Sequence, residues 1–467
     1  MTLRVVITGI GMVTPVGNST DATWQGLLAG TSGTGPLPAS WNLTSDYPVK
    51  AVGCVVGEEH LLAAALPAKY HARTDRFIHL TMIAAHEAMQ QAGLTAENPA
   101  DRTRIGAYVG VGLGGLSGIE EGVRAFDVSG IRRVSPVIIP KVISSLAPGW
   151  LSIQWQLQGP TLATASACAS STDALGLAMR AIRHGYADVM LAGGAEACIT
   201  PMCIGGFGNM RALSTWAGDP AAASRPFDAQ RTGFVLAEGA TMLILEREDH
   251  ARARGASIIA EISGYGATAD AHHVTAMHPE ADGAVRAMQV ALRDARLGPE
   301  DIGYINAHGT GTPMNDPCET LAIKKVFMRD DARILRDGAS HLLRTSAVRG
   351  GSAEIINGAR PEEPGEAQRA KTGVSKDSSG LSTMPLVSST KSMTGHMLGA
   401  AGATEAAICA LALRDQRVPP TINLTTPDPA CDLDYVPGVV RGHSFSHAMT
   451  NSFGFGGANA VLVVSKV

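Results

Sequence analysis

The sequence contains little charge, and what it has is balanced. Asp, Glu, Lys and Arg make up only 17% of its 467 residues, and 38 basic side chains against 42 acidic ones give a formal net charge of −4. A protein that binds nucleic acid or a membrane surface normally has a basic excess, so this balance argues against both partners. The chain also lacks an apolar run long enough to cross a bilayer. We therefore predict that it contacts neither nucleic acid nor membrane.

Paired cysteines are absent too. The seven cysteines form no CxxC pair, and no His/Cys cluster has zinc spacing, so we predict reduced thiols, a reducing compartment and no metal site. His272 and His273 are adjacent, and in an extended segment they would point to opposite faces. The opening "MTLRVVITGIGMVTP" predicts a strand and a glycine turn rather than a signal or transit peptide. These features predict a cytoplasmic protein, or one of an organellar matrix if the chain is a processed form.

The chain is instead rich in small residues and in short apolar segments. It has 53 glycines and enough length for about two or three domain-sized units. Strand candidates such as "RVVITGIG", "RIGAYVGVG", "ADVMLAGG", "ATMLILER", "IGYINAHG" and "ANAVLVVSKV" alternate with amphipathic or Ala-rich helical segments. Near-continuous apolar strands that alternate with helices predict an α/β fold built on buried sheets.

One arrangement occurs twice. "AAHEAMQQAGL" precedes "RIGAYVGVGLGG", and "AMQVALRDARL" later precedes "IGYINAHGTGT". Each copy is an Ala-rich helix, a turn and a strand that ends in a Gly-rich loop. Duplication of an α/β unit is the favoured explanation, although Ala/Gly-rich chains also produce such similarity by chance. Residues 344–384 break the pattern with Gly, Ser, Pro, Glu and Lys, which predicts a flexible surface insertion. A regulatory or partner-binding role is the alternative.

The stretch "TASACASS" places Cys168 among small residues at the start of a predicted helix, 169–185. A thiol there lies at the positive end of the helix dipole, which favours the thiolate. Small neighbours leave the backbone N–H groups accessible and make room for a substrate. A buried structural thiol is the commoner reading of a lone cysteine, so the case for a nucleophile depends on its partners.

Two histidines supply those partners. His308 follows an apolar strand in "INAHGTGTP", and His396 lies in "SSTKSMTGHMLGAAGATEAA" with Lys391 and Glu405. A loop histidine is more often structural than catalytic, but two in Gly-flanked loops together with one thiol match the Cys/His sets of nucleophilic catalysis. In "NSFGFGGAN" the phenylalanine among glycines is either a plain turn residue or a gate to a hydrophobic tunnel. "GVGLGGLSG" lacks the lysine and the acidic partner of phosphate-binding loops.

Read together, these motifs resemble the elongating β-ketoacyl-[acyl-carrier-protein] synthases, class II (long-chain), of the thiolase superfamily. The resemblance runs almost end to end outside the insertion. It is carried by "VVITGIGMVTPVGN", "ASACASS", "ADVMLAGGAEA", "RALST", "SRPFDAQRTGFVLAEGA", "INAHGTGTP", "SSTKSMTGHMLGAAGA", "PPTINL" and "NSFGFGGAN". One such motif is weak evidence, whereas all of them in this order are specific.

The resemblance implies a duplicated thiolase-like fold with a layered α-β-α-β-α core, divided into halves at 1–254 and 255–467, and a homodimer. It implies decarboxylative Claisen condensation of malonyl-ACP with an acyl-cysteine, releasing CO₂ and 3-oxoacyl-ACP. Acyl-ACP and malonyl-ACP would be the partners. No free cofactor is expected, because phosphopantetheine arrives on the acyl carrier protein (ACP).

The resemblance also assigns roles to residues of this chain. Cys168 matches the nucleophile, and His308 and His396 match the pair that assists decarboxylation and stabilises the enolate. Lys391 matches the lysine that orders the site, with Glu405 as its ionic partner. The backbone N–H groups of Cys168 and Phe455 would form an oxyanion hole, and the Phe455 ring would be the gate. Further matches are pantetheine-contacting Thr310 and Thr312, acyl-pocket residues Leu113 and Phe207, and a carrier-protein rim of Lys69, Arg73, Arg132, Arg133 and Arg211.

Two positions depart from the family pattern, and other functions are alternatives to elongation. Gly311 stands where serine is usual between the threonines, and Thr232 where an acidic residue is common. Solvated charge is the alternative for each residue of the rim. A chain-length-factor-like scaffold would share the fold but replace the nucleophile, and Cys168 is present. A degradative thiolase needs a second cysteine where this chain has "GFGGAN", and a starter-type synthase has asparagine where this chain has His396.

Overall fold

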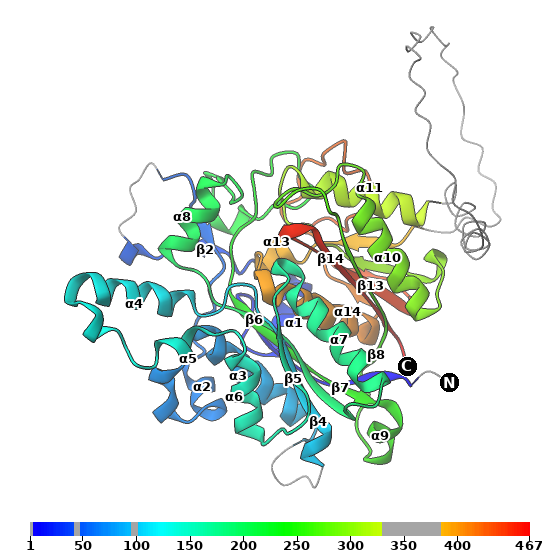
Figure 1. The fold of residues 1–467 in the computed structure, drawn as a ribbon. Helices are drawn as coiled ribbons and strands as arrows, with labels where there is room; N and C mark the ends of the chain where they lie inside the picture. The colour runs from blue at the N-terminus through cyan, green and yellow to red at the C-terminus, as the bar shows by residue number, and fades with distance from the viewer. Residues whose placement is uncertain (1–2, 42–46, 95–100, 329–383) are drawn as a thin grey trace, which may run out of the picture.

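The computed structural model describes residues 3–41, 47–94, 101–328 and 384–467, and they build one large sheet covered by helices (Figure 1). The ten strands of this sheet run in the order β10-β9-β13-β14-β8-β1-β7-β6-β4-β5. Most of the predicted insertion, 344–383, lies outside the described residues. Within the described part of the chain, no helix has the length and apolar character needed to span a membrane.

The sheet consists of two half-sheets with the same strand order. The N-terminal half-sheet contains β1 (Val5–Val13), β4 (Ile105–Gly110), β5 (Thr161–Thr164), β6 (Val189–Glu196) and β7 (Gly239–Arg247). The C-terminal half-sheet contains β8 (Ala260–Ala269), β9 (Tyr304–Asn306), β10 (Leu386–Ser388), β13 (His447–Gly454) and β14 (Ala458–Ser465). Numbered within its own half, each runs 3-2-4-5-1 from its outer edge. Corresponding pairs also share their parallel or antiparallel sense.

The half-sheets meet where β1 pairs with β8, at Val6–Glu261 and Ile7–Ala260. Helix α9 (Glu248–Ala253) stands just before that junction in the chain. The repeated topology confirms the predicted duplicated fold. The division into domains at residue 254 stays a prediction.

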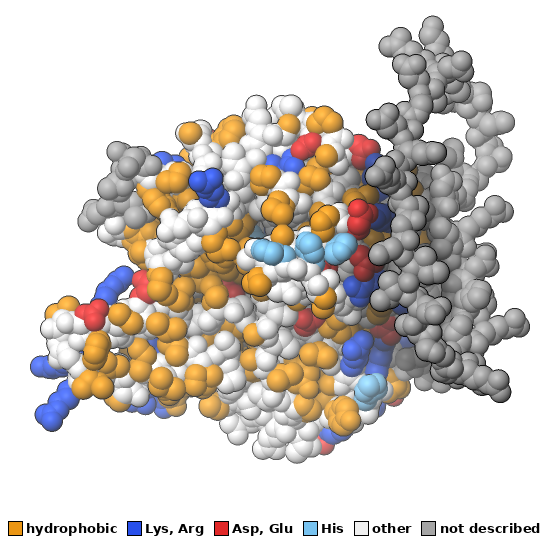
Figure 2. Space-filling model, turned by 45° about the horizontal axis from the view of Figure 1, so that its top comes forward, with side chains coloured by type: hydrophobic (Ala, Val, Ile, Leu, Met, Phe, Trp, Pro, Cys, Tyr) orange, Lys and Arg blue, Asp and Glu red, His pale blue; other side chains and the backbone are white. Residues whose placement is uncertain are grey.

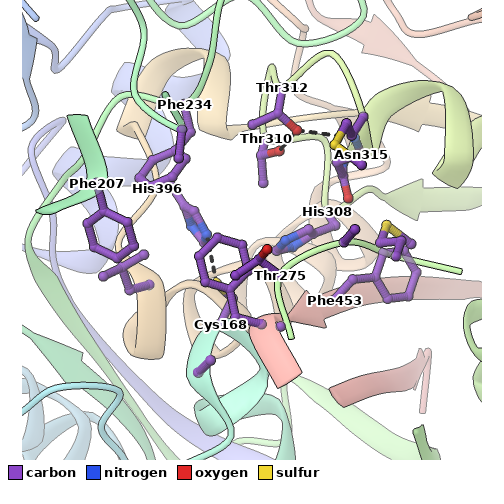
Figure 3. A pocket seen from close by; sticks show the side chains of 18 of the residues that line it. Cys168, Phe207, Phe234, Thr275, His308, Thr310, Thr312, Asn315, His396 and Phe453 are labelled. Atoms are coloured by element: carbon purple, nitrogen blue, oxygen red, sulfur yellow. Dashed lines mark hydrogen bonds between the residues drawn. The ribbon is translucent and has the colours of Figure 1, made fainter. Parts of the chain in front are cut away.

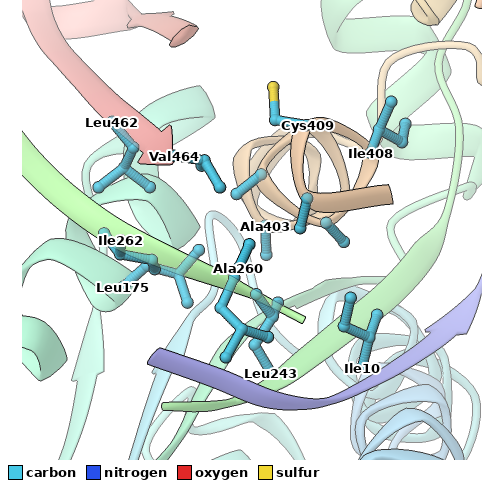
Figure 4. Packing of buried hydrophobic residues seen from close by; sticks show 14 of the residues in the cluster. Ile10, Leu175, Leu243, Ala260, Ile262, Ala403, Ile408, Cys409, Leu462 and Val464 are labelled. Atoms are coloured by element: carbon cyan, nitrogen blue, oxygen red, sulfur yellow. The ribbon is translucent and has the colours of Figure 1, made fainter. Parts of the chain in front are cut away.

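Helices form three layers with the half-sheets between them, as predicted. Outside the N-terminal half-sheet lie α3 (Arg76–Gln91) and α6 (Leu146–Trp155), and outside the C-terminal one lies α10 (Asp282–Ala295), which packs against α11 (Asn315–Phe327). Helices α7 (Ser170–Arg183) and α14 (Ala401–Asp415) fill the middle and contact strands of both halves. Figure 4 shows this central packing, with α14 above the strands. Alanine and glycine on both central helices allow the two half-sheets to approach.

Glycine pairs repeat the same close packing in each half. A Cβ on Gly11 of β1 would lie 1.8 Å from the carbonyl oxygen of Ala84 in α3. A Cβ on Gly266 of β8 would lie 2.1 Å from the carbonyl oxygen of Ala287 in α10. Neither position can hold a side chain while the helix stays at this distance. The two copies of the Ala-rich helix seen in the sequence are therefore equivalent in packing as well.

The remaining elements surround this core. The helices are α1 (Thr20–Ala29), α2 (Glu59–Ala65), α4 (Leu116–Ser129), α5 (Ile138–Val142), α8 (Pro201–Asn209) and α13 (Lys391–Thr394), and the short strands are β2 (Gly35–Pro36), β3 (Ala51–Val52), β11 (Arg417–Val418) and β12 (Arg441–Gly442). Helix α4 projects to one side (Figure 1).

Candidate active site

Cys168 lies in a tight turn between β5 and α7. The turn contains a short 3-10 helix, Ala167–Ala169, and Ala167 has a φ of 52°. Ser170 fixes it, because its Oγ accepts from the Ser166 N–H at 3.0 Å and donates to the Ala167 carbonyl at 2.7 Å. A Cβ on Gly454 would lie 2.7 Å from the Ser166 carbonyl oxygen. The small residues around Cys168 therefore let the turn close and let a neighbouring strand end approach it.

His396 directs its ring at the sulfur. Its Nε2 lies 3.1 Å from Cys168 Sγ (Figure 3). Two backbone hydrogen bonds hold the histidine, since its N–H donates to the Val235 carbonyl at 2.7 Å and its carbonyl accepts from the Ala237 N–H at 3.0 Å. The Phe234 ring meets the imidazole edge-on, with ring centres 5.3 Å apart. The position of His396 is thus set by backbone pairing with a segment distant in the sequence.

His308 completes the cluster from the end of β9. Its ring centre lies 5.3 Å from that of His396, and the two ring planes are nearly perpendicular at 86°. Donor atoms of Cys168, His308 and His396 all lie within 4.8 Å of one another. Buried Glu319 on α11 accepts the N–H groups of His308 and Gly309, both at 2.7 Å. Glu319 is not among the predicted site residues, although an acidic residue so close in the sequence to the Gly-flanked His308 loop was a usable signal.

Lys391 and Glu405 form a buried ion pair behind the histidines. Each side chain is 2% exposed, and Lys391 Nζ bonds to Glu405 Oε1. Burial raises the pKa of Glu405 to about 7, and the nearby Lys391 charge opposes the rise. The predicted pairing is present.

Burial and the Lys391 charge also determine the protonation of the site. Burial lowers the pKa of His308 and His396 well below the usual range, and Lys391 lowers both further. Both imidazoles are therefore neutral near pH 7, with one N–H each to donate. Burial raises the pKa of Cys168 to about 12, against the lowering effect of Lys391 and of a hydrogen bond from the Phe455 backbone. The thiolate expected from the helix start does not prevail, because desolvation is the larger effect.

A cavity of about 440 Å³ opens at the sulfur. In Figure 3, Phe207 lies on one side of the Cys168–His396 pair, and Thr310 and Thr312 lie on the other. Leu113 lines the same cavity. The structure thus brings together the four residues that the resemblance places along the substrate. Gly311 has a φ of 78°, a conformation that favours glycine, so the departure from serine suits this backbone. Thr232 accepts a hydrogen bond from the Thr215 N–H and does not line the cavity.

Phe455 closes one wall of the cavity. Its side chain is 36% exposed, and its ring centre lies 6.3 Å from that of Phe207. The two following residues, Gly456 and Gly457, both have positive φ. An exposed ring followed by two glycines suits the predicted gate, and this role stays a prediction.

The five basic residues of the predicted rim are exposed, but they are not equivalent. Arg211 lines the cavity, whereas the other four lie on two 3-10 helices, Ala68–Arg73 and Ile131–Arg133, outside it. Their role in carrier-protein binding stays a prediction.

The same Cys/His/His cluster is the only group of three metal-type donors found within the described residues. An ion there would occupy the sulfur and the imidazole nitrogens that the resemblance assigns to catalysis. The absence of a metal site remains a prediction.

Comparison with known proteins identifies the family. Residues 2–251 match the β-ketoacyl synthase N-terminal domain, and residues 259–342 and 357–425 match the β-ketoacyl synthase C-terminal domain. The chain belongs to the β-ketoacyl synthase family. Its members named below are condensing enzymes of the acyltransferase type, and the chain is one too.

Named relatives are similar over their whole length. The 3-oxoacyl-[acyl-carrier-protein] synthase 2 of Coxiella burnetii is 42% identical over 464 residues, which cover 99% of both chains. That of Synechocystis is 40% identical over 99% of this chain and 98% of the relative. Two solved structures match with a TM-score of 0.82 each, and each match covers 100% of this chain and 100% of the other. One is a β-ketoacyl synthase from Burkholderia phymatum, which is 32% identical. The other, 30% identical, is from a type II polyketide system in which an acyl carrier protein is in complex with its ketosynthase. These similarities confirm the predicted family and thiolase-like fold.

Proposed function

We propose that this enzyme elongates fatty acyl chains by condensing malonyl-ACP with an acyl group held on Cys168. The observation that carries the proposal is the 3.1 Å approach of His396 Nε2 to Cys168 Sγ, beside His308 and inside a cavity. The full-length relatives named 3-oxoacyl-[acyl-carrier-protein] synthase 2 support the substrate class. The pantetheine group belongs to the carrier protein, so the enzyme itself needs no free cofactor.

In the first half-reaction the sulfur attacks the acyl thioester of acyl-ACP. The Cys168 proton leaves through His396 to the departing pantetheine sulfur, and a new thioester forms at Cys168. The backbone N–H of Phe455 already points at the sulfur and, with that of Cys168, suits the oxyanion that forms during attack. Covalent capture divides the transfer into two easier steps.

In the second half-reaction malonyl-ACP loses CO₂. The electron pair of the broken C–C bond passes to the thioester oxygen, and the N–H groups of neutral His308 and His396 are suited to stabilise it. One such preorganised donor is worth roughly 3–4 kcal/mol. The resulting carbanion attacks the acyl-Cys168 carbonyl, and the tetrahedral intermediate expels the Cys168 sulfur to give 3-oxoacyl-ACP. Burial keeps both imidazoles neutral, as this role requires, and the Lys391 charge lowers their pKa further.

We propose that the enzyme works as a homodimer. β5 is the edge strand of the large sheet, and an unpaired edge invites pairing with another strand. Large apolar side chains lie exposed on β5 and on the neighbouring α4–α6 segment: Ile119, Val123, Phe126, Val128, Ile131, Ile139, Ile143, Ile153 and Leu162. Figure 2 shows hydrophobic and basic side chains together on the projecting α4 region. Exposed large apolar side chains concentrated in one region in this way are typical of a subunit interface.

The basic rim and the compartment complete the proposal. Arg211 at the cavity mouth and the exposed pairs Lys69/Arg73 and Arg132/Arg133 suit an acidic carrier protein. All seven cysteines are unpaired, which suits a reducing cytoplasm or organellar matrix.

The test is incubation of the wild-type enzyme and Cys168→Ala with malonyl-ACP and acyl donors of different length, with products analysed by mass. Wild type should release CO₂ and 3-oxoacyl-ACP, and the variant should form no acyl-enzyme and no condensation product while keeping its unfolding midpoint. Condensation by Cys168→Ala at the wild-type rate would overturn the proposal. Failure of an acyl-mimicking epoxide to label Cys168, together with stable heterodimer formation, would favour the scaffold alternative.

A further inference from the structure

Glu196 is a fully buried carboxylate at the end of β6 that the mechanism above does not use. No cationic side chain is hydrogen-bonded to it among the described residues. Four backbone N–H groups donate to it instead. Its Oε2 accepts from Gly112 at 2.8 Å and from Gly399 at 3.2 Å, and its Oε1 accepts from Leu113 at 3.1 Å and Gly114 at 3.3 Å.

These donors come from two loops far apart in the sequence. The Gly112–Gly114 loop follows β4, and Gly112 and Leu113 line the cavity. Gly399 belongs to the short 3-10 helix Leu398–Ala400, which follows directly after His396. His396 and Leu398 line the same cavity. The carboxylate therefore joins the acyl side of the cavity to the segment that carries a proposed catalytic histidine.

The surrounding glycines are shaped to the carboxylate. A Cβ on Gly112 would lie 2.5 Å from Glu196 Oε2, and one on Gly399 would lie 2.8 Å from the same oxygen. A side chain at either position would push the carboxylate away. Leu113, by contrast, is 45% exposed, so burial does little to hold its side chain in place. Its position along the cavity thus depends on the backbone hydrogen bonds that Glu196 accepts.

We propose that Glu196 is a positioning and specificity-determining residue of the condensing reaction: its carboxylate fixes the Leu113 wall of the acyl cavity against the loop that carries His396. The proposal rests on the function proposed above. Glu196 acts through the two loops and does not touch the reacting atoms. Removing its acceptors should let Leu113 move relative to Cys168, so acyl chains of different length should respond unequally.

Electrostatics provides an independent signature. Burial raises the pKa of Cys168, the Lys391 charge lowers it, and the charges of Glu196 and Glu405 raise it further. Burial raises the pKa of Glu196 itself to about 7, so its charge acts on Cys168 above that pH. A neutral residue at 196 should therefore shift the pH dependence of Cys168 alkylation to lower pH. A purely structural side chain would slow or accelerate alkylation equally at every pH.

The experiment compares wild type, Glu196→Gln and Glu246→Gln in the full chain. Glu246 is the control because it is equally buried and lies at the opposite end of the β6–β7 ladder, with Thr8 and Arg254 as partners. The kcat/KM values for short and long acyl donors are measured, together with iodoacetamide labelling of Cys168 from about pH 8 to about pH 12, a range that reaches the raised pKa of this thiol.

We expect Glu196→Gln to change the long-to-short ratio of kcat/KM by roughly 10-fold, the size of one misplaced packing contact, and to shift the alkylation profile to lower pH. The control should change neither. A uniform loss with an unchanged ratio and profile would overturn the proposal. If Glu196→Gln does not fold, Glu196→Asp, which keeps the charge but shortens its reach, should change the ratio without shifting the profile. If wild type condenses nothing, the proposed function fails, while the labelling profile still tests the placement of Glu196.

Discussion

Ser166 donates a hydrogen bond from its Oγ to the carboxylate of Asp173, which ties the turn before Cys168 to the first turns of α7. The other oxygen of Asp173 accepts from Tyr265 OH on β8 at 2.6 Å. The turn that contains Cys168, in one half, is thereby fastened to the first strand of the other half.

Asp173→Ala should loosen the turn. We expect an unfolding free energy lower by about 1–3 kcal/mol, because Tyr265 loses a buried partner, and a rate of Cys168 acylation lower by roughly 10-fold. Urea unfolding and single-turnover acylation measure the two effects. Tyr265→Phe is the matched control: it removes one bond to Asp173 but leaves the Ser166 bond, so stability should fall while acylation stays near wild type. Equal acylation losses in both variants would contradict the assignment.

Replacement of either active-site histidine should slow malonyl decarboxylation. His308→Ala and His396→Ala each remove one N–H donor, so we expect rates lower by about 10²–10³-fold. Release of CO₂ from malonyl-ACP measures this. The control His79→Gln concerns a partly buried histidine on α3, bonded to Thr74 outside the cavity, and should decarboxylate normally. An undiminished rate in both alanine variants would exclude their proposed role.

The neutral histidines predict a particular pH dependence of stability. The pKa of His308 and His396 is lowered in the folded protein. Below the unfolded pKa near 6.5, both histidines therefore bind protons in the unfolded chain but stay neutral in the folded protein. Stability should therefore be complete above about pH 6.5 and fall as the pH drops towards 5. Denaturant unfolding at several pH values should show a shallower loss for the His308→Asn, His396→Asn double variant. An equal slope in both proteins would contradict this.

Substitutions in the Lys391–Glu405 ion pair should affect the stability of the protein and its rate of decarboxylation differently. Lys391→Met leaves the buried Glu405 carboxylate without its cation, which should cost about 3–5 kcal/mol. Adding Glu405→Gln should recover most of that stability. The double variant should nevertheless decarboxylate more slowly at pH 6 than at pH 8, because the imidazoles lose the positive charge that adds to burial in lowering their pKa. A flat profile between these values would show that Lys391 has only a structural role.

The sequence predicted the segments that carry the candidate site residues well, because each of them is a short local motif. The strands β1, β4, β6, β7, β9 and β14 are apolar runs and were all anticipated. β5 was missed because threonines flank its two apolar residues, β10 because it follows directly after the Gly- and Ser-rich segment 344–384, and β8 because Gly and Ala interrupt it. Glu319 contacts the nearby loop of His308 and Gly309, so its place in the sequence was a usable signal. Glu196 contacts two loops distant in the sequence, which no spacing rule encodes. The protonation of Cys168 depends on burial, which a helix-start pattern cannot report.

The two half-sheets have the same strand order, but their equivalent loops carry different residues of the site. The Leu113 loop follows the second strand of the N-terminal half, and His308 follows the second strand of the C-terminal half. Cys168 follows the third strand of the N-terminal half, and the Lys391–His396 segment follows the third strand of the C-terminal half. Equivalent positions thus carry Leu113 and Cys168 in one half and the two histidines with Lys391 in the other. The proposed reaction takes groups from both halves, and neither half-sheet alone contains the complete set.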